Sequence, residues 1–279
     1  MLNNVAYTLA EDKTGLDVAR NYAEKALNEL DERSINDVEA DDTGLRVTYQ
    51  LSLVWDTLGW VYFQSGDTNR AGSFVRAAWI LGQDATVGEH LAEICEKQGK
   101  SKEAAHLYEL AMAAQSSPAV RMIPTGVSVT VPLVPSFDAS AHDAWRENVL
   151  ARYRKLTGKN PSNEIRRLPN GQWTLSPGEE LSHMRATKLG KILEKSGSAE
   201  FSIVFAPGKV ESARFVSGEE SLESLTDQMK AAHYLVEFPT GSKAKILRRA
   251  ELSCTPSAGC IVVLLPPDRG RAAQNVGQD

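Results

Sequence analysis

The sequence predicts an α plus α+β protein, in which an array of helical hairpins is followed by a small domain with the order strand, strand, helix, strand, strand. Three observations lead to this fold class. Small and aromatic residues recur in the first part of the chain, with a spacing of 33 residues from Ala71 to Ala104. The helical periodicity stops after Pro118, and the alternation of apolar and polar residues that is typical of strands begins at Ala199.

The clearest repeat begins at Trp55 with the sequence Trp-Asp-Thr-Leu-Gly-Trp-Val-Tyr. It continues with a turn glycine at Gly66 and with small residues on a second helix, where Gly59 and Ala71 would let two antiparallel helices approach closely. A second unit has the same spacing, with Leu91, Ala92, Cys95, Gly99, Ala104, Tyr108 and Ala111. These residues resemble the tetratricopeptide repeat (TPR) family, whose period is about 34 residues. The resemblance implies a TPR array over residues 1–117.

A less regular first unit begins at Met1 and includes Ala19, Ala23 and Ala26. Ala19 lies 52 residues before Ala71, so about 18 residues are inserted relative to the period of the family. The insertion falls near residues 28–50, whose polar sequence predicts a loop.

In TPR arrays, partners bind to the concave face of the first helix of each repeat. The resemblance therefore implies a partner-binding surface made of Asn3, Tyr7, Asp56, Trp60, Phe63, Gln64, Glu89, Glu93 and Glu96. An aromatic pair flanked by carboxylates fits an extended peptide or a helix of basic character. The alternative is that Trp60 and Phe63 pack against the insertion or against the second domain.

Residues 118–198 are expected to form a linker with one or two short strands, a helix over residues 142–156 and an irregular connector over residues 157–177. The second domain is expected over residues 199–268. A hairpin comes first, and capping-box spacing at residues 217–220 then precedes a helix with one apolar face, formed by Leu222, Leu225, Met229 and Ala232. Strand-like segments follow at residues 235–238, 243–254 and 260–265, and residues 269–279 are expected to be a disordered tail.

The segment from Val204 to Leu265 resembles the C-terminal domain of TonB-type energy-transducing proteins, through a Pro-Gly hairpin tip, a Val-Ser-Gly sequence before the helix and a Phe-Pro sequence after it. Nearly the whole chain resembles the C-terminal tails of bacterial transglutaminase-like envelope proteins. The residues that carry this likeness lie at 55–62, 76–79, 96–99, 248–254 and 259–260. The resemblance implies secretion and an oxidising environment. The upstream domain with Cys-His-Asp chemistry is not in this sequence, so no activity is carried over.

Cys254 and Cys260 flank a short turn sequence between two strand-like segments, a spacing that permits a disulfide bond. The alternative is that both are unpaired strand cysteines. A disulfide favours the periplasm or the cell envelope, and its absence would favour the cytoplasm. The N-terminus lacks the features of a secretory signal, which favours a cytoplasmic protein or part of a longer secreted chain. Cys95 lies in a helical pattern and is expected to be buried.

Charge and motifs exclude several function classes. Residues 1–120 carry 10 basic and 19 acidic residues, which argues against nucleic acid as a ligand. No apolar segment is long enough to cross a bilayer. The sequence contains no nucleophile elbow, phosphate-binding glycine loop or metalloprotease motif, and its five histidines lack metal-ligand spacing, so no catalytic residue, metal or cofactor is expected. Arg248 and Arg249 are candidates for an anion site, but strand alternation directs them to opposite faces. We expect at least one of them to be solvated or ion-paired.

The sequence therefore predicts a noncatalytic interaction module of the bacterial cell envelope that binds a protein or peptide. One alternative is a regulatory or substrate-presenting tail of a larger transglutaminase-like enzyme. A second is a hydrolase whose site has no familiar motif.

Overall fold

The computed structural model describes residues 2–36, 42–116, 120–122, 128–130, 139–161, 174–190 and 196–267. The chain divides into two compact units, one made of Met1–Gly82 with Arg185–Asp279 and the other of Gln83–Met184. The division lies inside the helical array that the sequence predicts over residues 1–117. The expected tail at 269–279 and part of the expected linker lie outside the described residues.

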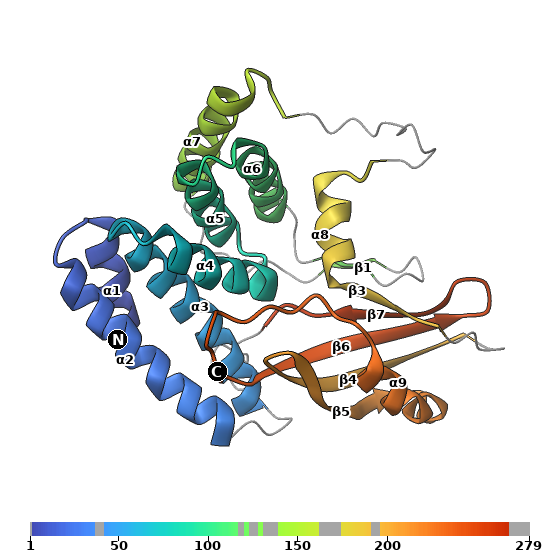
Figure 1. Cartoon of the computed structure of the whole chain (residues 1–279). Helices are drawn as coiled ribbons and strands as arrows, with labels where there is room; N and C mark the ends of the chain where they lie inside the picture. Colours follow the sequence, from blue (N-terminus) through green and yellow to red (C-terminus); the bar gives the residue numbers. More distant parts are fainter. Residues whose placement is uncertain are drawn as a thin grey trace, which may run out of the picture. The chain divides into compact units, whose positions relative to one another are not determined.

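Paired helices make up the described part of the first 116 residues (Figure 1). In the first unit, α1 packs on α2, α2 on α3, and α3 on α4; the second unit contains the pair α5 and α6. The bounds are α1 Leu2–Glu11, α2 Leu16–Asn36, α3 Asp42–Gln64, α4 Thr68–Gly82, α5 Ala85–Lys97 and α6 Ser101–Ser116. Each pair is joined by a short turn, which requires its two helices to run antiparallel.

The turns of the three hairpins repeat the same two backbone hydrogen bonds. In the turn from α3 to α4, the amide of Gly66 donates to the carbonyl of Phe63, and the amide of Asp67 donates to that of Tyr62. This is the Schellman arrangement, in which the residue after the helix adopts a left-handed conformation that favours glycine. The corresponding donors are Lys13 and Thr14 in the first turn and Gly99 and Lys100 in the third. The left-handed residues are Lys13, Gly66 and Gly99, with φ of 54°, 89° and 76°.

Small residues allow the helices of each pair to approach closely, as the sequence predicts. A Cβ added at Gly59 would lie 2.5 Å from Cγ2 of Val75 on α4. The three alanines that begin the second helices, Ala19, Ala71 and Ala104, have no exposed surface. Glycine and alanine at these positions therefore set the spacing between the paired helices.

The polar loop expected near residues 28–50 is not a loop. Helix α2 continues to Asn36, and α3 begins at Asp42, so that only residues 37–41 lie outside the described part of this segment. The insertion lengthens two adjacent antiparallel helices. Its polar residues fit a helix because Glu29, Glu32 and Arg33 are exposed while Leu30 and Ser34 are buried.

An antiparallel sheet in the order β3-β7-β6-β4-β5 completes the first unit (Figure 1). Its strands are β3 Ala186–Leu189, β4 Gly197–Ala206, β5 Lys209–Gly218, β6 Ile246–Thr255 and β7 Gly259–Leu264. From β4 onward the order is strand, strand, helix, strand, strand. Strand β3 was not expected from the sequence, because four residues are too few to show a clear alternation.

Two details of the expected second domain are wrong. Residues 235–238 form no strand, although their side chains alternate between exposed and half-buried. The expected helix begins as a 3₁₀ helix, η1 Glu220–Leu225, without a side-chain cap, and continues as α9 Thr226–Ala231. Of its expected apolar face, Leu222, Leu225 and Met229 are buried, whereas Ala232 lies beyond the helix and is half-buried.

The sheet packs against α3 in the same unit. Leu45 of α3 forms a buried cluster with Val204 of β4 and Leu247 of β6. Farther along α3, the ring of Trp55 makes an edge contact with Phe238, at 6.0 Å between centroids. These contacts join the helices and the sheet into one hydrophobic core.

The second unit contains two further helices and a short strand pair. Helix α7, Ala139–Thr157, includes the helix expected at residues 142–156 and packs on α6. Helix α8, Pro177–Arg185, begins with a capping box in which Ser176 and Glu179 exchange hydrogen bonds. The strands β1 Val120–Met122 and β2 Ser128–Thr130 pair antiparallel.

Candidate functional site

The nine residues of the expected binding surface are divided between the two units. Six lie on α1 and α3 of the first unit, and Glu89, Glu93 and Glu96 lie on α5 of the second. The nine positions therefore form two groups, one in each unit.

The α1–α3 surface contains the aromatic pair. The rings of Trp60 and Phe63 are stacked, with 4.9 Å between centroids and 25° between planes. Trp60 is only 6% exposed, whereas Phe63 is half-buried. The ring of Trp60 is thus part of the core, and Phe63 covers it at the surface.

The remaining residues of this surface differ in their exposure. Asp56 is buried, at 7% exposed, while Asn3, Tyr7 and Gln64 are half-exposed. Helices α1 and α3 pack against each other, and each contributes half-exposed side chains. We define the α1–α3 surface by Asn3, Tyr7, Phe63 and Gln64.

The three α5 carboxylates already have partners within the second unit. Trp145 Nε1 of α7 donates to Glu89, and Arg152 of α7 forms an ion pair with Glu93. The hydroxyl of Tyr108 on α6 donates to Glu96 at 3.1 Å. Burial raises the pKa of Glu89, and the hydrogen bond from Trp145 opposes that shift. Helix α7 therefore occupies the position on α5 where the sequence predicts an external partner.

A hollow of about 340 Å³ lies between α6 and α7. The imidazole of His106 approaches Glu180 of α8 at 2.8 Å and Glu109 at 3.7 Å. The hydroxyl of Tyr153 donates to Glu109 at 2.6 Å, and burial together with this hydrogen bond raises the pKa of Tyr153 to about 12. A phenol with a raised pKa is a poor proton donor and a poor nucleophile at neutral pH. The cluster is better suited to holding α6, α7 and α8 together than to chemistry.

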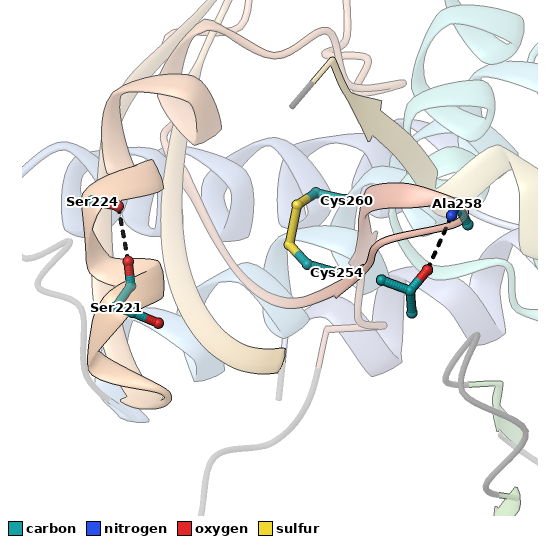
Figure 2. The surroundings of a disulfide bond; sticks show 6 residues. Ser221, Ser224, Cys254, Ala258 and Cys260 are labelled. Carbon is teal, nitrogen blue, oxygen red and sulfur yellow. Dashed lines mark hydrogen bonds between the residues drawn. A yellow bond between two sulfur atoms is a disulfide. The ribbon is translucent and has the colours of Figure 1, made fainter. Parts of the chain in front are cut away.

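Cys254 and Cys260 are joined by a disulfide bond. Figure 2 shows this bond between the strands β6 and β7, beside the turn that connects them. The two cysteines are directly opposite in the strand register, and in the turn Ala258 N donates to Thr255 Oγ1 at 3.1 Å. Both cysteines are buried, and so is Cys95, which forms no disulfide bond.

The described part of the chain holds neither a metal-binding cluster nor a membrane-spanning helix. No group of three or more His, Cys, Asp or Glu side chains there is arranged to hold a metal ion. None of the helices that the structure describes is both long and apolar enough to cross a membrane.

The residues that attach the sheet to the helices were not recognisable in the sequence. Ser34 and Thr48 are completely buried, and their hydroxyl oxygens accept hydrogen bonds from Lys245 N at 3.1 Å and from Leu247 N at 2.8 Å. In the sequence, the only indication of these residues was a polar segment whose hydroxyl residues have helical spacing. Hydropathy alone does not distinguish such a segment from an exposed loop.

Arg248 and Arg249 behave as strand alternation predicts. Arg249 pairs with Asp42 at 3.1 Å and lies 3.6 Å from Glu200. Arg248 is buried on the opposite face of the sheet. The expectation that at least one of the two is an ion-paired structural residue is confirmed by Arg249.

Comparisons with known proteins give no relative for this chain. A scan against protein-family models found no match, and searches of curated proteins and of solved structures found no significant match either.

Proposed function

We propose that this chain is a protein–protein interaction module of the bacterial cell envelope, which binds a peptide or protein partner on its α1–α3 surface. In this proposal, residues 1–117 are a TPR array that has diverged by the lengthening of α2 and α3. Residues 199–268 are a domain related to the TonB C-terminus.

The observation that supports the TPR interpretation best is the repetition of the hairpin turns. Three turns use the same pair of hydrogen bonds, followed each time by a buried alanine. Repeated hairpins stack into extended surfaces, and proteins built from them commonly act through such surfaces. A binding function is therefore more consistent with this architecture than a catalytic one.

The exposure of the side chains favours the α1–α3 surface over α5 as the binding site. The α5 carboxylates are engaged by α7 and α6, so a partner would first have to displace Trp145 and Arg152. Tyr7 and Phe63 are half-exposed, so both present aromatic surface to solvent. Aromatic side chains provide much of the binding energy at protein interfaces.

The assignment to the cell envelope rests on the disulfide bond. Structural disulfides persist in oxidising compartments such as the periplasm and are rare in the bacterial cytoplasm. The bond between Cys254 and Cys260 joins two adjacent strands of the sheet, where it would stabilise a secreted protein.

A pull-down from periplasmic extract tests this function. The full chain is immobilised in four forms: the wild type, Tyr7→Ala with Phe63→Ala, Glu93→Gln, and Tyr22→Ala. Tyr22 is a half-buried tyrosine on α2, outside the proposed surface, and serves as the matched control.

We expect one protein to be retained by the wild type, by Tyr22→Ala and by Glu93→Gln. The double variant of Tyr7 and Phe63 should not retain it. Circular dichroism and the melting temperature establish that the double variant is folded. Equal retention by all four forms would exclude the α1–α3 surface as the binding site. Selective loss with Glu93→Gln would move the site to α5.

A further inference from the structure

Two arginine side chains of the first unit, one buried and one half-buried, lie away from every carboxylate that the structure describes. Arg248 on β6 is 2% exposed, and Arg185 is the last residue of α8. Among the residues that the structure describes, no carboxylate lies within ion-pair distance of either guanidinium. Arginine is almost never buried in this way unless it is paired, because burial removes the hydration of its charge.

The acceptors that these arginines do have are neutral. Arg248 donates from Nε and Nη2 to the backbone carbonyl of Leu265, at 2.9 Å for Nε. Arg185 donates from Nη2 to the carbonyl of Gly82 at 3.4 Å, and its Nε is buried without an acceptor in the described part of the chain. Carbonyl oxygens satisfy some of the N–H groups, but they do not neutralise either charge.

Both arginines approach the same end of β7. Arg185 directly precedes β3, whose Ala186 pairs with Val263 of β7. Arg248 reaches Leu265, the residue immediately after that strand. The convergence of the two side chains on one strand end places two positive charges close together.

The electrostatic effect of this convergence is visible at Arg248. Burial, and after it the nearby charge of Arg185, lowers the pKa of Arg248 to about 9. Burial lowers the pKa of Arg185 to about 10. Both guanidinium groups are still protonated at neutral pH, so the local charge excess persists under physiological conditions.

The excess of positive charge at Arg185 and Arg248 is local, because the next arginine of the strand, Arg249, does not share it. It follows Arg248 directly but lies on the opposite face, where Asp42 and Glu200 balance its charge. Among the described residues, two carboxylates thus balance the charge of Arg249, whereas none lies within ion-pair distance of Arg248.

We propose that Arg185 and Arg248 form a binding site for an oxyanion, a phosphate or a carboxylate group, at the end of β7. The unpartnered Nε of Arg185 and the N–H groups of Arg248 that Leu265 does not use are the donors. Guanidinium groups bind such anions through paired, charge-assisted hydrogen bonds. Arg185 is not fully enclosed, which gives the anion a route from solvent.

The test measures anion binding by the full chain, with inorganic phosphate and acetate as separate probes in buffers of equal ionic strength made up with chloride. Titration calorimetry gives the stoichiometry, and thermal unfolding gives the stabilisation. The variants are Arg185→Gln and Arg248→Gln, with Arg249→Gln as the matched control. A chain ending at Pro267 tests whether the acidic residues after that point supply the anion.

The expected result is saturable binding of close to one anion per chain. The melting temperature should rise by about 3–6 °C at roughly ten times the dissociation constant. Arg185→Gln and Arg248→Gln should abolish the saturable binding, while Arg249→Gln should retain it. If Arg248→Gln does not fold, Arg185→Gln carries the test, because Arg185 is less completely buried.

The two probes separate the sources of the anion. Tighter binding of phosphate than of acetate indicates a phosphate ligand, and the reverse indicates a carboxylate. An equal rise in melting temperature for all variants would reflect general exclusion of phosphate from protein surfaces, and would overturn the proposal. Binding that appears only in the chain ending at Pro267 would also overturn it, because the carboxylates would then come from the chain itself.

Discussion

Thr48 on α3 accepts a hydrogen bond at 2.8 Å from the backbone amide of Leu247 on β6, and both residues are completely buried. Strand β7 pairs with β6 only from Ala250 onward, so the amide of Leu247 lies beyond the end of the neighbouring strand. Two residues earlier, just before β6 begins, the backbone amide of Lys245 donates a hydrogen bond to Ser34 of α2 in the same way. Hydroxyls of the two lengthened helices thus replace the missing strand.

Replacing Thr48 with Val tests this replacement. The two side chains are nearly the same size, so Thr48→Val leaves the amide of Leu247 buried without an acceptor. An unsatisfied buried polar group costs about 1–3 kcal/mol. We expect the free energy of unfolding in urea to fall by that amount. Thr8→Val is the control, because the Thr8 hydroxyl is exposed and donates to Asn4 within its own helix; comparable losses for both variants would show that the contact with Leu247 is not the cause.

Gly59 is the second position where one substitution is informative. A Cβ at this position would lie 2.5 Å from Val75 Cγ2 and 3.1 Å from the backbone nitrogen of Val75. Gly59→Leu should therefore separate α3 from α4, at a cost of about 1–3 kcal/mol. Thermal unfolding should show a midpoint lower by several degrees. Gly178→Ala, where nothing lies within 4 Å of an added Cβ, should leave the midpoint nearly unchanged.

The sequence predicted the helical hairpins well because their signals are local. Gly66, Gly99 and the buried alanines have specific roles in turns and in helix contacts, and each could be recognised from spacing alone. The helical nature of residues 28–50 could not. Its buried positions include Ser34 and Thr48, and a hydroxyl that binds a strand more than 190 residues away has no local signature.

The expected α5 site shows the same limit. Glu89 and Glu93 have the residue type and the helical position of binding residues, and from the sequence nothing distinguished them from free carboxylates. Their partners Trp145 and Arg152 are on α7, more than 50 positions away, in a segment expected to be part of a linker. Whether a surface helix position is open depends on which later helix covers it, and that is a tertiary property.

The disulfide bond predicts a specific thiol count. The unfolded, unreduced protein should react with one equivalent of thiol reagent, at Cys95. Substitution of both Cys254 and Cys260 by Ala should cost about 2 kcal/mol, because the bond restricts the unfolded chain only over a short loop. Three reactive thiols in protein isolated from an oxidising compartment would contradict both the bond and the assignment to the envelope.

Asp31 predicts a pH-dependent stability. Burial raises its pKa to about 6 from the ordinary value of 3.8, and its Oδ1 has no hydrogen-bond partner in the described part of the chain. The folded state then binds the proton more tightly than the unfolded state, so this contribution to stability is complete below about pH 4. It is lost as the pH rises through about 6.

Asp31→Asn should remove the loss of stability that accompanies the ionisation of Asp31 as the pH rises. Because Asp31 is only half-buried, solvent screening limits the gain to about 1 kcal/mol. We expect the unfolding free energies of Asp31→Asn and the wild type to agree at pH 4 and to diverge in favour of the variant by pH 7.5. Glu32→Gln, at an exposed neighbouring position, should show no such divergence. A constant difference at all pH values would mean that ionisation of Asp31 is not responsible.

Substitutions at the stacked pair of Trp60 and Phe63 can separate an effect on folding stability from an effect on partner binding. Trp60 is 6% exposed, so Trp60→Ala should leave a cavity and cost about 3–5 kcal/mol, measured by urea unfolding. Phe63 is half-buried and covers the Trp60 ring, so Phe63→Ala should cost less than half as much while removing exposed aromatic surface. If α1 and α3 form the binding surface, Phe63→Ala should weaken partner binding in a protein that still melts cooperatively. A loss of stability from Phe63→Ala as large as that from Trp60→Ala would instead make the pair a core element, and partner binding would then have to depend on Tyr7 and its neighbours on α1.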